Sequence, residues 1–148
     1  MSIQQAIADH LAAALRVTAG VGDMTGTKPP FISVWGDPGG PGDDLSVGAT
    51  TDSVVEVGVT FTAALVAVAN RMAADGVQAL TPCFRPGSLQ VSNSVAELEF
   101  DTVYDAVVDR AVTLPESDSH PAYAVARFRA HVHPIPEGAT YAPDPSTP

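Results

Sequence analysis

The sequence predicts a single α+β domain in which two or three helices flank a mostly antiparallel β-sheet. Three patterns carry this prediction: an apolar stripe at helical spacing in residues 2–17, an alternating stretch that becomes Ala-rich in residues 53–75, and a strict alternation in residues 122–133. We assign the domain to residues 1–133. Residues 134–148 contain five prolines and no hydrophobic period, so we expect an extended C-terminal arm.

The first predicted helix spans residues 2–17. Ser2 and Gln5 fit a capping box, in which the N-cap hydroxyl and the side chain three residues later bind backbone N–H groups at the start of the helix. The apolar stripe repeats every four residues and comprises Ile3, Ile7, Leu11 and Leu15. We expect Gly20 and Gly22 to end this helix.

A loop of residues 21–30, closed by two prolines, leads into residues 31–35. This segment, FISVW, has a strong strand preference, and we expect a strand that is buried on both faces. Residues 36–52 then form a long loop rich in Gly, Pro and Asp. Loops of this length inside a compact domain are usually functional or mobile.

The loop of residues 36–52 matches no phosphate-binding or calcium-binding pattern. A phosphate loop requires a Lys beside its glycines, and this loop has none. A calcium loop requires oxygen ligands at fixed alternate positions and a closing Glu, which Asp37, Asp43 and Asp44 do not provide. We interpret the loop as an arm that orders against a neighbouring subunit, with these three aspartates as contact candidates.

The longest apolar run of the chain occupies residues 53–75. Its first half alternates, and one face of the predicted strand carries Val55, Val57, Val59 and Phe61. Its second half is Ala-rich with apolar residues at helical spacing, and Gly76 is the expected stop. The boundary is open: the strand either gives way to a helix near Thr62 or continues to Asn70.

The segment after this run is harder to interpret. Residues 77–87 form a connection, and residues 88–100 alternate loosely, which predicts a short strand and a turn at Asn93. Residues 99–113 repeat at helical spacing and predict a further helix with Asp101 as its N-cap. Because this segment is rich in β-branched side chains, a pair of strands is the alternative.

The last predicted strand spans residues 122–133. Alanines, Phe128 and Val132 make up its apolar face, which we expect to join the core. The other face is polar and includes Arg127, Arg129, His131 and His133. We expect Arg127 and Arg129 to meet complementary charge across a repeated subunit contact.

Composition narrows the class of protein. The chain has 148 residues, 45% of them hydrophobic and 16% charged, against about a quarter charged in a typical domain. Scarce surface charge indicates either extensive subunit contacts or a GC-rich source genome. The net charge of −10 argues against a surface that binds nucleic acid or anionic membrane.

The N-terminus and the single cysteine bear on the compartment. Cys83 is the only cysteine, so no disulfide can form within the chain. The first ten residues have no basic segment followed by a continuous apolar one, and we expect no signal peptide. The apolar run also lacks the roughly 20 uninterrupted residues of a membrane span. We therefore expect a soluble intracellular product or a particle assembled inside a cell.

The strongest candidate for chemistry is a possible metal site at His131, His133 and Glu137. Two His at i and i+2 on a strand project from the same face, with Cα atoms about 7 Å apart, and a nearby carboxylate can complete a metal-binding set. The pattern resembles the first half of a cupin metal motif, although Val125 stands where that motif has Gly. A small metal-binding, cupin-like protein or enzyme is therefore the alternative function.

No other pattern indicates catalysis. Cys83 lacks the surroundings of a nucleophile, and the chain contains none of the common hydrolase, metalloprotease or dinucleotide motifs. We expect the protein not to be an enzyme and to need no cofactor.

The order of elements resembles that of the tail-terminator and neck (head–tail completion) proteins of long-tailed bacteriophages. The segments that carry the resemblance are residues 3–15, 30–37, 54–62 and 123–132. The resemblance implies a homo-oligomeric ring, a hexamer in that family, which caps the growing tail tube and then binds the neck of the filled head.

The same resemblance implies the protein's partners and location. These are further copies of itself, the tail tube and the neck proteins, within a virion assembled in the host cytoplasm. It also makes the loop of residues 36–52 and the arm of residues 134–148 the natural contact arms, and an acidic ring would let DNA pass without sticking.

Overall fold

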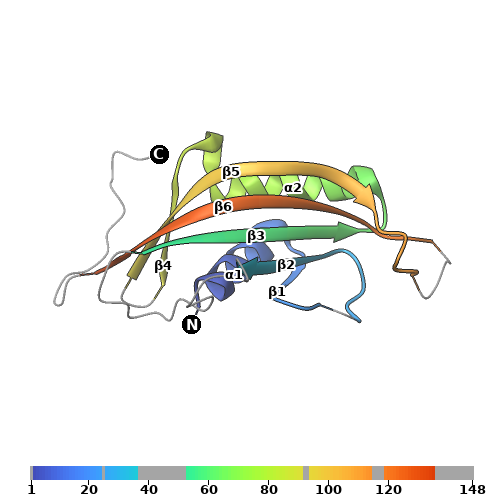
Figure 1. Cartoon of the computed structure of the whole chain (residues 1–148), viewed down its shortest axis with the longest axis horizontal. Coiled ribbons are helices and arrows are strands. Elements are labelled where there is room, and N and C mark those ends of the chain that lie inside the picture. Colours follow the sequence, from blue (N-terminus) through green and yellow to red (C-terminus); the bar gives the residue numbers. More distant parts are fainter. Residues whose placement is uncertain (1, 25, 37–52, 92–93, 115–118, 136–148) are drawn as a thin grey trace.

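A computed structural model of the chain describes residues 2–24, 26–36, 53–91, 94–114 and 119–135 (Figure 1). These residues form one six-stranded sheet in the order β1-β2-β3-β6-β5-β4. All neighbouring strands are antiparallel except β1 and β2, which are parallel. Both helices lie on one face of the sheet, behind it in Figure 1. The predicted α+β class, with a mostly antiparallel sheet and two flanking helices, is confirmed.

Helix α1 (Ile3–Leu15) begins at the predicted N-cap, Ser2, although the Gln5 side chain donates to Asp9 instead of completing the capping box. The Ser2 side chain accepts a hydrogen bond of 3.1 Å from the backbone N–H of Gln5. The helix ends at Leu15 because Arg16 adopts a left-handed conformation, with φ of 56°. The expectation that glycines end the helix was wrong, since Gly20 lies within the following short strand, β1 (Thr18–Val21), which the sequence did not predict, and Gly22 follows that strand.

Strand β2 (Phe31–Gly36) confirms the predicted strand, but it is fully buried on one face only. Ile32 and Val34 are inaccessible to solvent, whereas Phe31, Ser33 and Trp35 on the other face are half-buried. The helices cover the first face and leave the second open. Residues 37–52, with the contact candidates Asp37, Asp43 and Asp44, lie outside the described residues.

The central apolar run divides at Ala63. Strand β3 (Ser53–Ala63) ends there, and helix α2 (Val66–Leu80) follows, so the strand does not continue to Asn70. Gly76 lies within α2 and does not stop it. A Cβ at that position would overlap the ring of Phe61, so the glycine lets the helix pack closely on the sheet.

The segment after α2 differs most from prediction. A short 3-10 turn, η1 (Pro82–Phe84), leads into β4 (Gly87–Val91) and then β5 (Ser94–Val108). The sequence predicted one short strand with a turn at Asn93, whereas the structure has two strands here, and residue 93 itself lies outside the described part. The helix predicted for residues 99–113 was wrong, because this stretch continues β5 and pairs with β6 as far as Val108.

Strand β6 (Ala122–Pro134) confirms the last predicted strand and its alternation. Its alanines and Phe128 are buried against the helices, and its Arg and His side chains lie on the open face. The core is built from this face of the sheet together with the apolar stripes of α1 and α2. Residues 136–148, most of the predicted arm, lie outside the described residues. No helix in the described part of the chain is long and apolar enough to cross a membrane.

Candidate subunit-contact surface

The second half of β5 is an edge that no described strand covers. Strand β4 pairs with β5 only between Ser94 and Leu98. From Glu99 to Val108, β5 is paired with β6 on one side, and among the described residues no strand pairs with the other side. In Figure 1 this stretch forms the upper edge of the sheet. An unpaired edge presents backbone N–H and C=O groups that a second chain can bind.

Large apolar side chains are exposed along this edge. We call them the β5 patch; their exposed fractions lie between 41% and 54%, and the members are Val103, Tyr104, Val107 and Val108. Clusters of exposed apolar side chains are typical of sites of protein association.

The β5 patch includes side chains on both faces of the strand. Val103 and Val108 lie opposite buried alanines of β6, which places them on the helix face. Tyr104 and Val107 lie opposite Val125 and Tyr123, which places them on the open face. The end of β5 therefore has one free edge among the described residues and exposed apolar side chains on both faces.

Apolar contacts continue the surface at the start of the free edge. The exposed ring of Phe84 lies edge-on against Phe100, with ring centroids 5.3 Å apart. Phe100 in turn contacts the buried ring of Phe128 at 6.1 Å. Edge-to-face aromatic contacts thus connect the start of the free edge to the core.

A hydrogen bond to α2 occupies one backbone group of the free β5 edge. The side-chain oxygen of Asn70 accepts a hydrogen bond of 2.7 Å from the backbone N–H of Ala106. Val66 precedes Asn70 by one helical turn and is also exposed, so α2 adds apolar surface beside β5. Asp101 and Asp105 are exposed on the same stretch, so the free edge is acidic as well as apolar.

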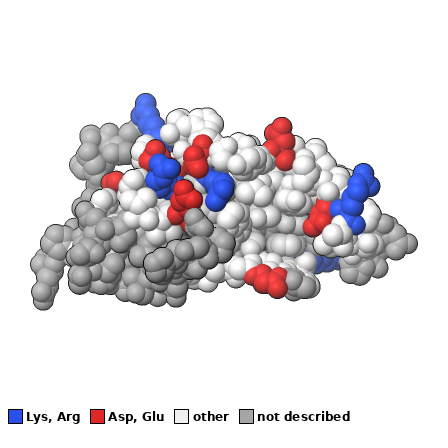
Figure 2. All heavy atoms as spheres, in the orientation of Figure 1, with Lys and Arg blue, Asp and Glu red and all other residues white. Residues whose placement is uncertain are grey.

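The open face of the sheet carries interspersed acidic and basic side chains (Figure 2). Arg127 lies 3.9 Å from the carboxylate of Glu56, and its guanidinium carbon is 5.7 Å from the centroid of the Trp35 ring. Arg129 is exposed and lies opposite Glu56 and Glu99 in the strand register. Of the two predicted contact residues on β6, Arg127 contacts Glu56 and Trp35, and Arg129 is the more exposed.

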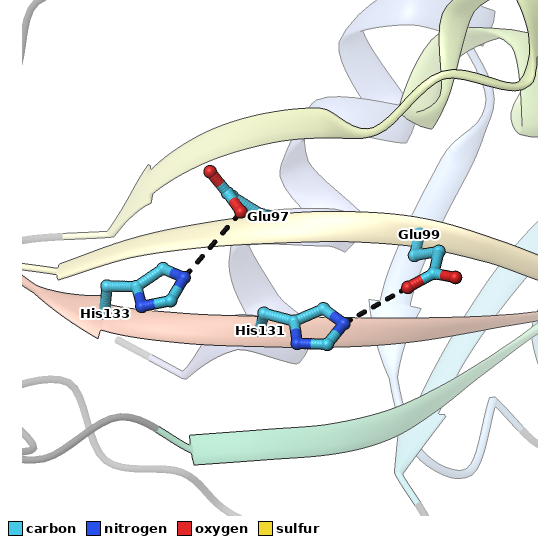
Figure 3. Close-up of polar contacts among 4 residues, drawn as sticks. All are labelled: Glu97, Glu99, His131 and His133. Atoms are coloured by element: carbon cyan, nitrogen blue, oxygen red, sulfur yellow. Dashed lines mark hydrogen bonds and ion pairs between the residues drawn. The ribbon is translucent and has the colours of Figure 1, made fainter.

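The two histidines of the predicted metal pair lie on this face, but each is directed at a different glutamate (Figure 3). The Nε2 atom of His131 is 3.2 Å from the carboxylate of Glu99. The Nε2 atom of His133 is 3.7 Å from the carboxylate of Glu97. All four side chains are at least partly exposed, as expected for cross-strand polar pairs on a solvated face.

This arrangement gives the metal hypothesis no support. Among the described residues no three His, Cys, Asp or Glu side chains are placed to hold one ion. Glu137, the third predicted ligand, lies outside the described residues. Cys83, the remaining candidate for chemistry, is exposed.

A cleft of about 870 Å³ opens on the same face, at the end where β6 begins. Its floor contains Ser33, Thr60, Thr62 and Tyr123, and its walls come from the loop after β1 and the segment after β5. Thr60 accepts a hydrogen bond of 2.9 Å from the indole N–H of Trp35. The cleft mixes hydroxyl and apolar groups and gathers no set of groups with a recognisable catalytic role.

Sequence reasoning missed the β5 patch and the two glutamates that face the histidines. The glutamates alternate in the segment ELEF, which places both on one face of a strand. Their partners depend on how β5 pairs with β6, which is not a local property of the sequence. No protein-family model matches this chain, and no curated protein matches its sequence.

Proposed function

We propose that this chain is a structural subunit that assembles with copies of itself into a ring, as a tail terminator or head–tail connector of a long-tailed bacteriophage. The observation that carries the proposal is the uncovered half of β5, where a free backbone edge coincides with exposed apolar side chains. Such an edge favours association, because pairing it buries apolar area and satisfies backbone groups.

The element order supports the phage assignment. Residues 3–15 are helical, and three further segments that carry the resemblance contain strands β2, β3 and β6. These elements form one compact sheet-and-helix unit, whose surface charge is sparse and of mixed sign in Figure 2. A surface with little charge favours packing against further subunits.

The proposed partners follow from the resemblance. They are further copies of the chain in the ring, then the tail tube and the neck proteins, within a virion assembled in the host cytoplasm. The net charge of −10 supports a lumen that repels the phosphates of passing DNA. We propose no specific nucleic-acid binding, no cofactor and no enzymatic activity.

Light scattering on the purified chain, with negative-stain electron microscopy of the same sample, tests the proposal. We expect a mass that is a multiple of 15.2 kDa, rising with concentration toward a closed ring with a central hole. If the ring closes only on its tube, purified tail tubes added to the chain will acquire a terminal cap. A monomer that neither rises in mass nor caps tubes would exclude the proposal.

A further inference from the structure

We infer that the free edge of β5 in one copy binds the free edge of β1 in the next, head to tail, so that the sheet continues from subunit to subunit. This inference rests on the proposed self-assembly and specifies which surfaces meet. In the described structure β1 and the free half of β5 lie on opposite sides of the sheet, separated by β2, β3 and β6. A closed ring needs two different, complementary surfaces on each subunit, and the two sheet edges provide them.

The β1 edge is also free among the described residues, and it differs from the β5 edge in charge. Strand β1 pairs with β2 on one side, and no described strand pairs with its other side. Val21 at its end is 43% exposed, and the exposed Arg16 precedes its first residue by two positions. Strand β1 itself carries no charged residue, and it is flanked two positions away by one base, Arg16, and one acid, Asp23. This edge is therefore uncharged and partly apolar.

Charge favours β1 over a second β5 as the partner. The free half of β5 carries Asp101 and Asp105, both exposed. Pairing two β5 edges about a two-fold axis would bring these acidic stretches together, and like charges opposite each other destabilise a strand pair. Pairing with β1 places the same carboxylates beside a strand that carries no charge of its own, so this repulsion is absent.

Strand direction and length also fit. Along the sheet, β1 runs parallel to β2 and β6 and opposite to β3 and β5. If successive subunits keep the same strand direction around a ring, β5 meets the next β1 in the antiparallel sense. The N–H of Ala106 already donates to Asn70, so a second chain cannot pair with β5 there. Before that point, β5 pairs regularly with β6 between Thr102 and Tyr104, which leaves a short regular stretch of free edge. Strand β1 has four residues and is short enough to pair with this stretch.

The faces of the joined strands predict which residues come together. Val103 lies on the helix face of β5. On β1, Ala19 and Val21 pair with the buried Ile32 and Val34, which places them on the helix face, whereas Thr18 pairs with Phe31 on the open face. In a continuous sheet Val103 therefore faces Ala19 or Val21 of the next subunit, and not Thr18.

Disulfide cross-linking tests this contact in the full chain. All variants carry Cys83→Ser, so that the native cysteine cannot react. Val103→Cys is combined in turn with Ala19→Cys, Val21→Cys or Thr18→Cys, and mild oxidation is followed by non-reducing gel electrophoresis. Directly opposed residues have Cα atoms about 4.5–5.5 Å apart, a separation that disulfides accept.

We expect a ladder of covalent oligomers from Val103→Cys with Ala19→Cys or with Val21→Cys. We expect at least tenfold less product from the pair with Thr18→Cys, and none from Val103→Cys alone. An exposed position on α2, Ala74→Cys, combined with Val103→Cys, is the matched control. Melting curves of all variants establish that each one folds.

Three results would overturn the inference in distinguishable ways. A covalent dimer from Val103→Cys alone would show two β5 edges meeting about a two-fold axis. Oligomers seen by light scattering without any β5-to-β1 cross-link would exclude this contact and leave self-assembly intact. A chain that stays monomeric at every concentration and does not cap added tail tubes would exclude both the contact and the proposed function.

Discussion

The side-chain oxygen of Asn70 accepts a hydrogen bond of 2.7 Å from the backbone N–H of Ala106, and this bond ties α2 to the free edge of β5. It satisfies one of the groups that an uncovered edge exposes. It also limits the length of edge that another chain can pair with. Asn70 thus sets one end of the stretch of β5 to which we propose that the next subunit binds.

Replacing Asn70 with Ala tests this role. We expect the amide of Ala106 to exchange with solvent faster and the free energy of unfolding to fall by about 0.5–1.5 kcal/mol, the usual contribution of one hydrogen bond. Gln78→Ala is the matched control, since Gln78 accepts from the backbone N–H of Cys83 near the other end of α2. An unchanged exchange rate at Ala106 in Asn70→Ala would contradict the assignment.

A charge placed in the β5 patch should block assembly without unfolding the subunit. We expect Val103→Asp to reduce the mass measured by light scattering to that of the monomer, because an unpaired carboxylate is costly to bury in an interface. Val54→Asp is the control: Val54 is 60% exposed and pairs with His131, toward the other end of the sheet. Equal loss of assembly in both variants would show that the β5 patch is not the assembly surface.

The contact between Gly76 and Phe61 predicts a specific stability effect. We expect Gly76→Ala to lower the free energy of unfolding by about 1–3 kcal/mol, as overpacking does in cores, even though Ala favours helices. The smaller side chain of Phe61→Leu should recover part of this loss in the double variant. Additive losses in the double variant, measured by denaturant unfolding, would show that the two residues do not interact.

Trp35 reports on the open face because it is the only tryptophan. Its ring lies over Gly58, where a Cβ would overlap it, and its N–H is bonded to Thr60. We expect Gly58→Ala to displace the ring from Thr60 and Arg127 and to shift its fluorescence to longer wavelength. Ala74→Val, at an exposed position of α2 on the other face of the sheet, should leave the spectrum unchanged. An unshifted spectrum in Gly58→Ala would contradict the contact.

The pairing of each histidine with its own glutamate predicts the response to metal. We expect equimolar Zn²⁺ to leave the melting temperature unchanged, because His131 and His133 are directed at different carboxylates. The double variant with both histidines replaced by Ala should behave in the same way. A saturable rise in melting temperature that the double variant loses would instead support the metal-binding alternative.

The elements that could be predicted from the sequence are those with one buried face and one exposed face. Helix α1 and strand β6 have such faces, and their apolar residues follow the helical and strand periods closely. Strand β3 could also be predicted, although only the structure places its end at Ala63. In these elements burial and local periodicity agree.

Strand β5 could not be predicted because its apolar residues do not follow the strand period. The register shifts between Phe100 and Thr102 and between Tyr104 and Val107. Each irregularity adds to the spacing between apolar side chains and converts a strand alternation into steps of three and four, which imitate a helix. Since apolar residues are also exposed on both faces, their pattern does not mark a core-facing side.

The candidate surface was predicted only in part. The polar face of β6 with Arg127, Arg129 and both histidines was anticipated, because alternation alone places them together. The free edge of β5 was not, because it depends on where β4 stops pairing with β5, and that depends on tertiary structure. The contact candidates in residues 37–52 remain predictions.

We propose that the uncovered half of β5 drives self-assembly, and paired light-scattering measurements test this role most directly. The native chain and Val103→Asp are compared over the same range of concentration, with matching melting curves. We expect a native mass that rises to a multiple of 15.2 kDa and a variant that stays at 15.2 kDa. A native chain that remains at 15.2 kDa throughout, or a variant that assembles equally well, would contradict it.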